Sequence, residues 1–146
     1  MAVNNKTFIN LYWSFRRYVY QNFITVPTYW NPLMRPNTTE EKFLVVRFQD
    51  DFIGKMSYSY PRIFCVAKED PEGVKLSELA SQVIEKFASE GSALKTIDFY
   101  NKDTGIVIGQ IWVKDVKTRP ALPYSEGYVH RAVDMTLRYP VEQRHL

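Results

Sequence analysis

The stretch EGYVHRAVDMTLRYP, residues 126–140, contains the residue types of a general acid–base pair. His130 is one of two histidines in the chain, and Asp134 follows four positions later. In a helix, residues four apart lie side by side, and such a pair is typical of a small hydrolase or a nucleic-acid-processing enzyme. In a strand the same two residues lie ~13 Å apart, beyond hydrogen-bonding reach. The chemistry of this stretch therefore depends on its periodicity.

The periodicity of this stretch favours a strand. Apolar residues alternate with mostly polar ones, and Tyr, Val and Thr, which strands prefer, are frequent. Arg131 is the one residue that violates the alternation. We therefore predict a strand over residues 128–139, with His130 and Asp134 on its polar face and without a catalytic dyad. A helix here would restore the dyad.

Other residues that could do chemistry lack suitable neighbours in the sequence. Cys65 stands between apolar residues in RIFCVA, which is typical of a small buried hydrophobe, and as a nucleophile it would need His130 or His145 as its base. Two histidines and one cysteine, widely separated, do not have the spacing of metal ligands. Neither a phosphate loop nor a dinucleotide-binding glycine fingerprint is present. We expect no catalytic, metal or cofactor site.

The charge of the chain is small but unevenly distributed. The net charge is +3; residues 1–39 contain four bases and no acid, and residues 40–104 contain twelve acids against nine bases. This division predicts two electrically different surfaces, without the clustered basic stripe of a dedicated nucleic-acid binder. No apolar run approaches the ~20 residues that span a bilayer, so we expect no membrane partner. The lone cysteine excludes an internal disulfide and is typical of a reducing compartment.

The elements that must position these residues form a single α+β domain over residues 1–146. Amphipathic periodicity predicts helices at about 7–23 and 76–89. Apolar or alternating runs predict strands at about 43–48, 57–67, 95–100, 106–114 and 128–139, and a short edge strand near residues 24–29. We expect a mixed, mainly antiparallel sheet of about four to five strands with both helices packed on it.

Three details of the predicted sheet can be tested directly. Pro61 removes one backbone donor and should break the strand at 57–67. The strand at 106–114 is apolar on both faces, which predicts a central strand covered on both sides. The segment KTRPALPYSEG, residues 117–127, is rich in proline and is predicted to be a loop.

The succession of elements resembles the tail-terminator family of long-tailed bacteriophages. The match consists of an N-terminal helix, a proline-marked extended segment with Pro27, Asn31 and Pro36, a strand of the FLVVRF type, and a later helix that packs on the sheet. The resemblance covers about residues 5–140 and depends on element order and a loose pattern.

The resemblance implies a six-membered ring of identical chains that caps the finished tail tube, ends its polymerisation and joins it to the head connector. The expected partners are further copies of the chain, the tail tube protein and a head-completion or connector protein, with DNA passing through the lumen without specific binding. The expected location is the virion, at the head–tail junction, after assembly in the host cytoplasm. An acidic lining would repel this DNA, so we expect Asp50 and Asp51 to face the lumen. The other residues expected at the pore or the ring contacts are Asn31, Arg35, Lys117 and Arg119.

Two other functions remain open from the sequence. A head-completion or neck adaptor protein of the same virion region would have similar surfaces and a different neighbour. An enzyme using His130 and Asp134 belongs to another class, and the secondary structure at 128–139 separates it from the first two.

Overall fold

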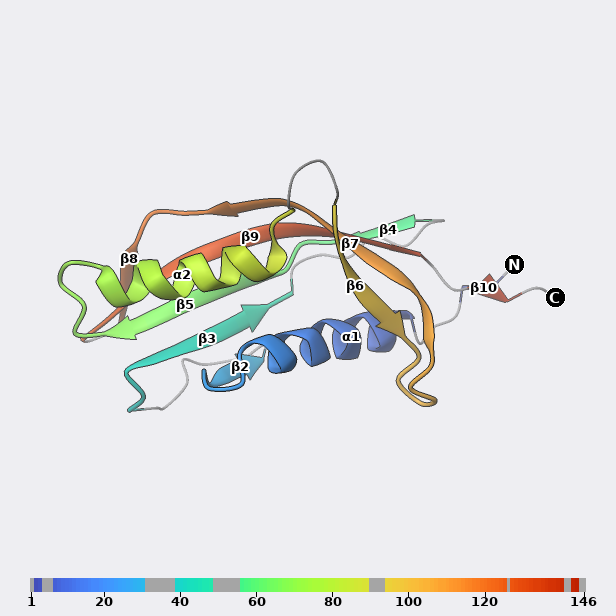
Figure 1. Cartoon of the computed structure of the whole chain (residues 1–146), viewed down its shortest axis with the longest axis horizontal. Helices are drawn as coiled ribbons and strands as arrows, with labels where there is room; N and C mark the ends of the chain where they lie inside the picture. Colours follow the sequence, from blue (N-terminus) through green and yellow to red (C-terminus); the bar gives the residue numbers. More distant parts are fainter. Residues whose placement is uncertain are drawn as a thin grey trace.

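The structure, a computed structural model, is a curled sheet that carries two helices, α1 (Thr7–Asn22) and α2 (Val74–Phe87) (Figure 1). It describes residues 2–3, 7–30, 39–48, 56–89, 94–125, 127–140 and 143–144. The chain is α+β, as predicted, and no helix within these ranges is long and apolar enough to cross a membrane. The two chain ends lie side by side at one end of the molecule.

The main sheet contains eight strands, more than the four to five predicted. In chain order they are β2 (Thr28–Trp30), β3 (Lys42–Arg47), β4 (Met56–Ser59), β5 (Arg62–Lys68), β6 (Lys95–Tyr100), β7 (Val107–Thr118), β8 (Leu122–Ser125) and β9 (Tyr128–Pro140). A separate two-stranded pair is formed by β1 (Ala2–Val3) and β10 (Gln143–Arg144). The prediction was too low mainly because one predicted strand is split in two and one predicted loop contains a strand.

The long strand β9 organises the sheet. The strand order is β2-β3-β5-β9-β7-β6, and β4 and β8 also pair with β9. All neighbours in the main sheet are antiparallel except β2 and β3, which are parallel. The sheet is therefore mixed and mainly antiparallel, as predicted.

The break at Pro61 lies where the sequence predicts it. Ser59 pairs with Leu137 of β9, and Arg62 pairs with Asp134. These two pairings belong to one continuous register, so β4 and β5 are two halves of a single strand interrupted at residues 60 and 61. A proline that lacks the ladder donor explains the interruption.

The prediction that residues 117–127 form a loop was wrong, because part of this segment pairs with the other edge of β9. The strand β7 continues to Thr118, and β8 follows within the predicted loop. A β-bulge shifts the β7–β9 register between Lys114 and Lys117, and Asp115 within it has a φ of 56°. Aspartate tolerates this left-handed conformation better than most residues. Prolines at residues 120 and 123 do not prevent this strand. In the described sheet β8 pairs with one end of β9 alone and is therefore an edge strand, where a missing backbone donor is tolerated.

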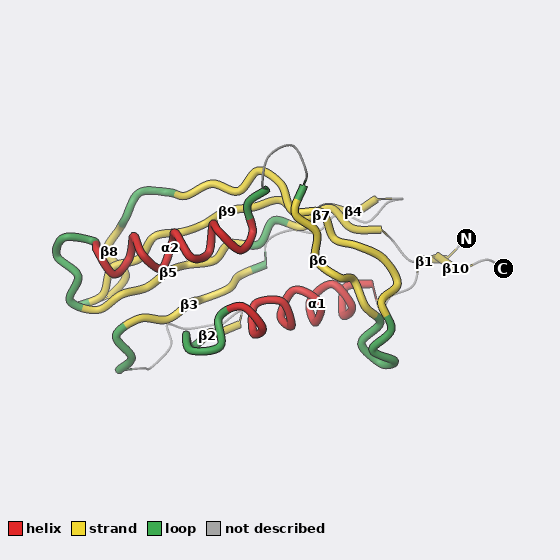
Figure 2. The backbone as a smooth tube through the Cα atoms, viewed as in Figure 1, coloured by secondary structure: helices red, strands yellow, loops and turns green. Residues whose placement is uncertain are grey.

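Both helices cover the same face of the sheet (Figure 2). The buried stripe of α1 is Leu11, Phe15, Val19 and, just beyond the helix, Phe23; the buried stripe of α2 is Leu76, Leu79, Ala80, Val83 and Phe87. Phe15 stacks on Phe87, with 5.4 Å between ring centroids. The side chain of Asp70 accepts hydrogen bonds from the backbone N–H groups of Lys75 and Leu76 and so caps the start of α2.

The prediction that the strand at 106–114 is covered on both sides was wrong. Ile111 and Val113 are buried beneath the helices, but Ile106, Val107 and Ile108 are 42–63% exposed. The reason is that β9 joins β7 only from Trp112 onward, so the first part of β7 pairs with β6 alone. Among the described residues, no helix lies over the face of the sheet opposite α1 and α2. We call this face the open face.

The helix α1 also covers part of the outer edge of β6. The backbone N–H of Tyr100 donates to the Oγ of Ser14 at 3.1 Å, and the backbone N–H of Lys102 donates to the Oδ1 of Asn10 at 3.1 Å. Both acceptor residues are 1% exposed. These bonds satisfy edge groups that would otherwise be available for pairing with another chain.

Replacing Ser14 with alanine should lower the free energy of unfolding by about 1–2 kcal/mol, because the N–H of Tyr100 loses its acceptor in a part-buried position. Urea denaturation measures the change. Gln21→Ala, at an exposed position of the same helix, is the control and should change stability little. Equal losses in the two variants would contradict a specific role for this hydrogen bond.

Candidate functional site

The open face is strongly basic. Residues paired across neighbouring strands have their side chains on the same side of the sheet, so the registers show which side chains lie on the open face. Arg119 follows β7, and its side chain reaches this face by bonding to Asp134. The bases on the open face are Arg47, Arg62, Lys68, Lys114, Lys117, Arg119 and Arg138. The acids that the same registers place there are Asp98 and Asp134. The registers of the described strands thus place seven bases and two acids on this face, and a third acid, Asp115, lies at the bulge of β7 beside Lys117.

One end of the open face is covered by its own aromatic rings. Phe43, Val45 and Val66 are buried there. The rings of Tyr29, Tyr124 and Tyr128 pack edge-on against Phe43, with centroids 5.5–6.2 Å apart. The basic residues beyond this cluster are therefore the part of the face that remains available to a partner.

Asp134 lies between two arginines at the centre of the open face. The Nε of Arg62 donates to its Oδ1 at 2.6 Å, and the Nη2 of Arg62 donates to its Oδ2 at 3.3 Å. The Nε of Arg119 donates to Oδ2 as well. The Asp134 side chain is 15% exposed, compared with 27% for Arg62 and 54% for Arg119. One carboxylate thus orients two guanidinium groups, and the cluster retains one net positive charge.

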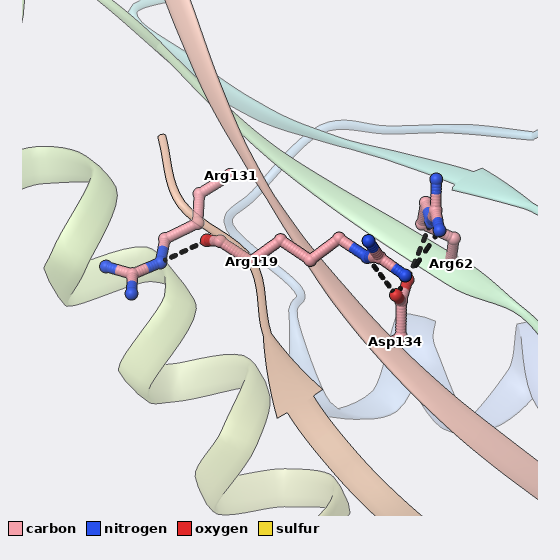
Figure 3. A network of polar contacts seen from close by, with 4 residues as sticks. All are labelled: Arg62, Arg119, Arg131 and Asp134. Carbon is pink, nitrogen blue, oxygen red and sulfur yellow. Dashed lines mark hydrogen bonds and ion pairs between the residues drawn. The ribbon is translucent and has the colours of Figure 1, made fainter. Parts of the chain in front are cut away.

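Arg119 makes three contacts, two of which, with Arg131 and Asp134, are drawn in Figure 3. Its backbone N–H donates to the carbonyl of Ala132 at 2.9 Å, and its carbonyl accepts from the Nε of Arg131 at 2.8 Å. Its side chain runs along the strand to Asp134. Arg131, the residue that violates the alternation of β9, therefore anchors the backbone between β7 and β8.

The two arginines set the ionisation of Asp134. Burial alone would raise the pKa of this carboxyl, but the hydrogen bonds and charges of Arg62 and Arg119 outweigh burial and hold the pKa below its ordinary value of 3.8. Asp134 is consequently a carboxylate at neutral pH and has the role of orienting the arginines.

His130 and Asp134 do not form the dyad that a helix would have created. Residues 128–140 are a strand, so the two side chains share the open face but lie about four residues, ~13 Å, apart. The ring of His130 packs edge-on between Phe64 and Tyr124, at centroid distances of 5.3 and 5.4 Å. Nothing in this arrangement brings the imidazole to the carboxylate.

Cys65 is a buried hydrophobe, as predicted. It is fully buried, and burial raises the pKa of its thiol to about 12, so it is not a thiolate at neutral pH. The described residues also contain no group of three or more His, Cys, Asp or Glu side chains that could hold a metal ion.

A hollow of about 360 Å³ adjoins the arginine cluster at the bulge of β7. Its lining includes Asp115, Lys117, Asp134 and Thr136, and Lys117 is the register partner of Asp134. Two predicted site residues, Lys117 and Arg119, are thus brought together on the open face. The other four, Asp50, Asp51, Asn31 and Arg35, lie outside the described residues.

Sequence reasoning missed most of the basic residues of this face. Arg47, Arg62, Lys114 and Arg138 are scattered over four strands, and only the pairing of those strands gathers them. The sequence did contain an indication of this face. Each of these bases stands next to an apolar or aromatic residue that faces the helices, so the alternation of the strand places the base on the opposite face. Asp134 was considered only as a partner of His130.

Replacing Asp134 with asparagine should lower the free energy of unfolding by about 2 kcal/mol at pH 7, because the three hydrogen bonds from Arg62 and Arg119 lose their charged acceptor and two arginines are left facing each other. The folded-state pKa of Asp134 is lower than the unfolded value. Its contribution is therefore present above pH 3.8 and is lost as the pH falls through the lower folded-state pKa.

Chemical denaturation at pH 7 and below pH 3 measures both effects. The stabilities of wild type and Asp134→Asn should converge in acid. Asp98→Asn, an exposed carboxylate on the same face that accepts a hydrogen bond from Gln110, is the matched control and should change stability little at either pH. A constant difference between wild type and Asp134→Asn across the pH range would contradict the assignment.

Comparison with known proteins gives information on the fold. No protein-family model matches the chain, and no curated protein matches it. Seven chains of solved structures do match. One of them, which carries no functional description, matches with a TM-score of 0.59 and 10% sequence identity over 94% of this chain and 97% of its own length. At this identity the likeness shows that the two chains share a fold.

Proposed function

We propose that this chain is a structural virion protein that assembles as a ring, a hexamer, on the end of a phage tail tube. There it ends polymerisation of the tube and joins it to the head connector. The order of elements supports this proposal through its resemblance to the tail-terminator family. The observation that carries the proposal is the open face, because it offers an extended charged surface in place of a catalytic pocket.

The two alternative functions, an enzyme and a neck adaptor, make different demands on the structure. A hydrolase using His130 and Asp134 needs the two side chains in contact, and the strand at 128–140 keeps them apart. A head-completion or neck adaptor would use the same surfaces with a different neighbour, and no feature of the described residues favours it over the terminator.

The proposal predicts that the purified chain forms particles of about six times its 17.2 kDa mass. Light scattering coupled to size exclusion, at two protein concentrations, measures this mass, and negative-stain images should show rings. When added to growing tail tubes of the same phage, the protein should bind their ends and stop growth. A chain that stays monomeric at both concentrations and leaves tube growth unchanged would refute the proposal.

A further inference from the structure

Within the part of the chain that the structure describes, the open face carries unpaired basic side chains, and the outward side of α2 carries two unpaired carboxylates. On the open face, Arg47, Lys68, Lys114, Lys117 and Arg138 have no carboxylate partner among the described residues. On the outward side of α2, two exposed carboxylates have no basic partner within the same ranges, Glu78 and Glu85. The helices also carry bases without a carboxylate partner in the described chain, Arg16, Arg17 and Lys86, so the acidic charge of the helices is confined to this one side of α2. The isolated chain therefore leaves a basic face on one side of the sheet and a pair of outward carboxylates, Glu78 and Glu85, on the other.

The acidic side has a regular spacing along α2. Glu78 and Glu85 are seven residues apart, which is about two helical turns, so both point to the same side at a separation of roughly 10.5 Å. This side lies opposite the buried stripe of α2, and both carboxylates face away from the sheet.

The bulge in β7 determines the spacing of the basic side chains on the open face. In a regular strand, residues three apart point to opposite faces. The bulge at Asp115 and Val116 shifts the register, so Lys114 and Lys117 both reach the open face, opposite Thr136 and Asp134. Arg119 continues the row. Successive members are about 7 Å apart, because their partners on β9 are two residues apart.

We propose that the basic row Lys114, Lys117 and Arg119 of one copy binds the Glu78–Glu85 side of α2 in a second copy. This inference rests on the ring proposed above and names its contact surfaces. The backbone positions of the row span about 14 Å. The guanidinium of Arg119 lies at Asp134, beside Lys117, so the unpaired charges of the row are those of Lys114 and Lys117. Their long, flexible side chains start about 7 Å apart and can reach the two glutamates. Since the two surfaces are different and lie on opposite sides of the sheet, the contact is head to tail, and repeating it produces a closed ring or an open filament.

A second copy fits this face better than a nucleic acid does. Three rings among the basic residues of this face are already covered by cations, with Lys114 over Tyr58, Arg62 over Phe64 and Arg138 over Trp112 at 5.2–5.9 Å. Asp134 already occupies donors of Arg62 and Arg119 that a phosphate would need. The chain itself supplies the complementary carboxylates on α2.

Paired charge reversals in the full chain test the contact. One variant carries Lys114→Glu and Lys117→Glu, and the other carries Glu78→Lys and Glu85→Lys. In each variant alone, both surfaces have the same sign, so self-association should weaken at least tenfold, as measured by sedimentation velocity at low salt. An equimolar mixture should regain assembly, because each variant then meets a partner of opposite sign.

Controls separate this contact from a general effect of charge. Lys42→Glu with Lys102→Glu makes the same change in net charge at exposed positions outside the row and should assemble like the wild type. Circular dichroism confirms that each variant is folded. Wild-type assembly should also weaken as salt is raised from 50 to 300 mM, because exposed charges are screened.

The outcomes distinguish the contact from the ring itself. If the wild type assembles and the folded reversal variants assemble equally well, the result contradicts the proposed contact but not the ring. The same conclusion follows if the variants lose assembly and their mixture does not regain it. A wild type that assembles neither in solution nor on tail tubes refutes the ring. If the Lys114→Glu, Lys117→Glu variant keeps its assembly and loses binding to a labelled DNA duplex, the open face is a nucleic-acid surface and the proposal is overturned.

Discussion

The pairing of β9 on both of its edges is the constraint on which the rest of the structure depends. This strand of 13 residues has β4 and β5 on one side and β7 and β8 on the other. Strands in a sheet twist, and a bulge increases the local twist. Each neighbour is interrupted once, one at Pro61, which lacks the ladder donor, and the other at the bulge of Asp115. These two interruptions let the sheet curl around the helices.

The same interruptions determine the chemistry of the open face. Beyond Pro61, Arg62 begins β5 directly opposite Asp134, and beyond the bulge Lys117 is the register partner of Asp134 on the β7 side. Without the bulge, the alternation of β7 would place Val116 and Thr118 on the open face in place of Lys117 and Arg119. A single left-handed aspartate therefore decides whether this part of the sheet is basic. Such local strain is tolerated where the surrounding pairing over-determines it.

Elements with a strong local periodicity could be predicted from the sequence. The helix expected at 76–89 is found at Val74–Phe87, and the strand expected at 128–139 is found at Tyr128–Pro140. The break at Pro61 could also be predicted, because the cause is local to one residue. The strand β8 could not, since it exists only through its pairing with β9 and its own prolines argue against it.

The candidate site was less predictable than the fold, because it too depends on the pairing of strands that are distant in the chain. Lys117 and Arg119 could be selected from the sequence, but their common face requires the bulge, which depends on tertiary pairing. The charges of the open face come from strands that are distant in the chain, and no window of sequence contains them together. His130 and Asp134 show the opposite error, since proximity in sequence suggested a pair that a strand keeps apart.

A charged open face in place of an apolar one has a physical consequence for assembly. An exposed apolar sheet face would drive association that is strong and largely insensitive to salt. Partly exposed arginines and lysines stay hydrated in the single chain, so each contact must exchange hydration for ion pairs of modest strength. Orientation then comes from matching the positions of charges, and strength comes from the number of contacts made together. A closed ring makes every copy contribute both surfaces, whereas a pair of copies leaves one surface of each unused. Contacts of this kind favour completion of the ring over accumulation of small fragments.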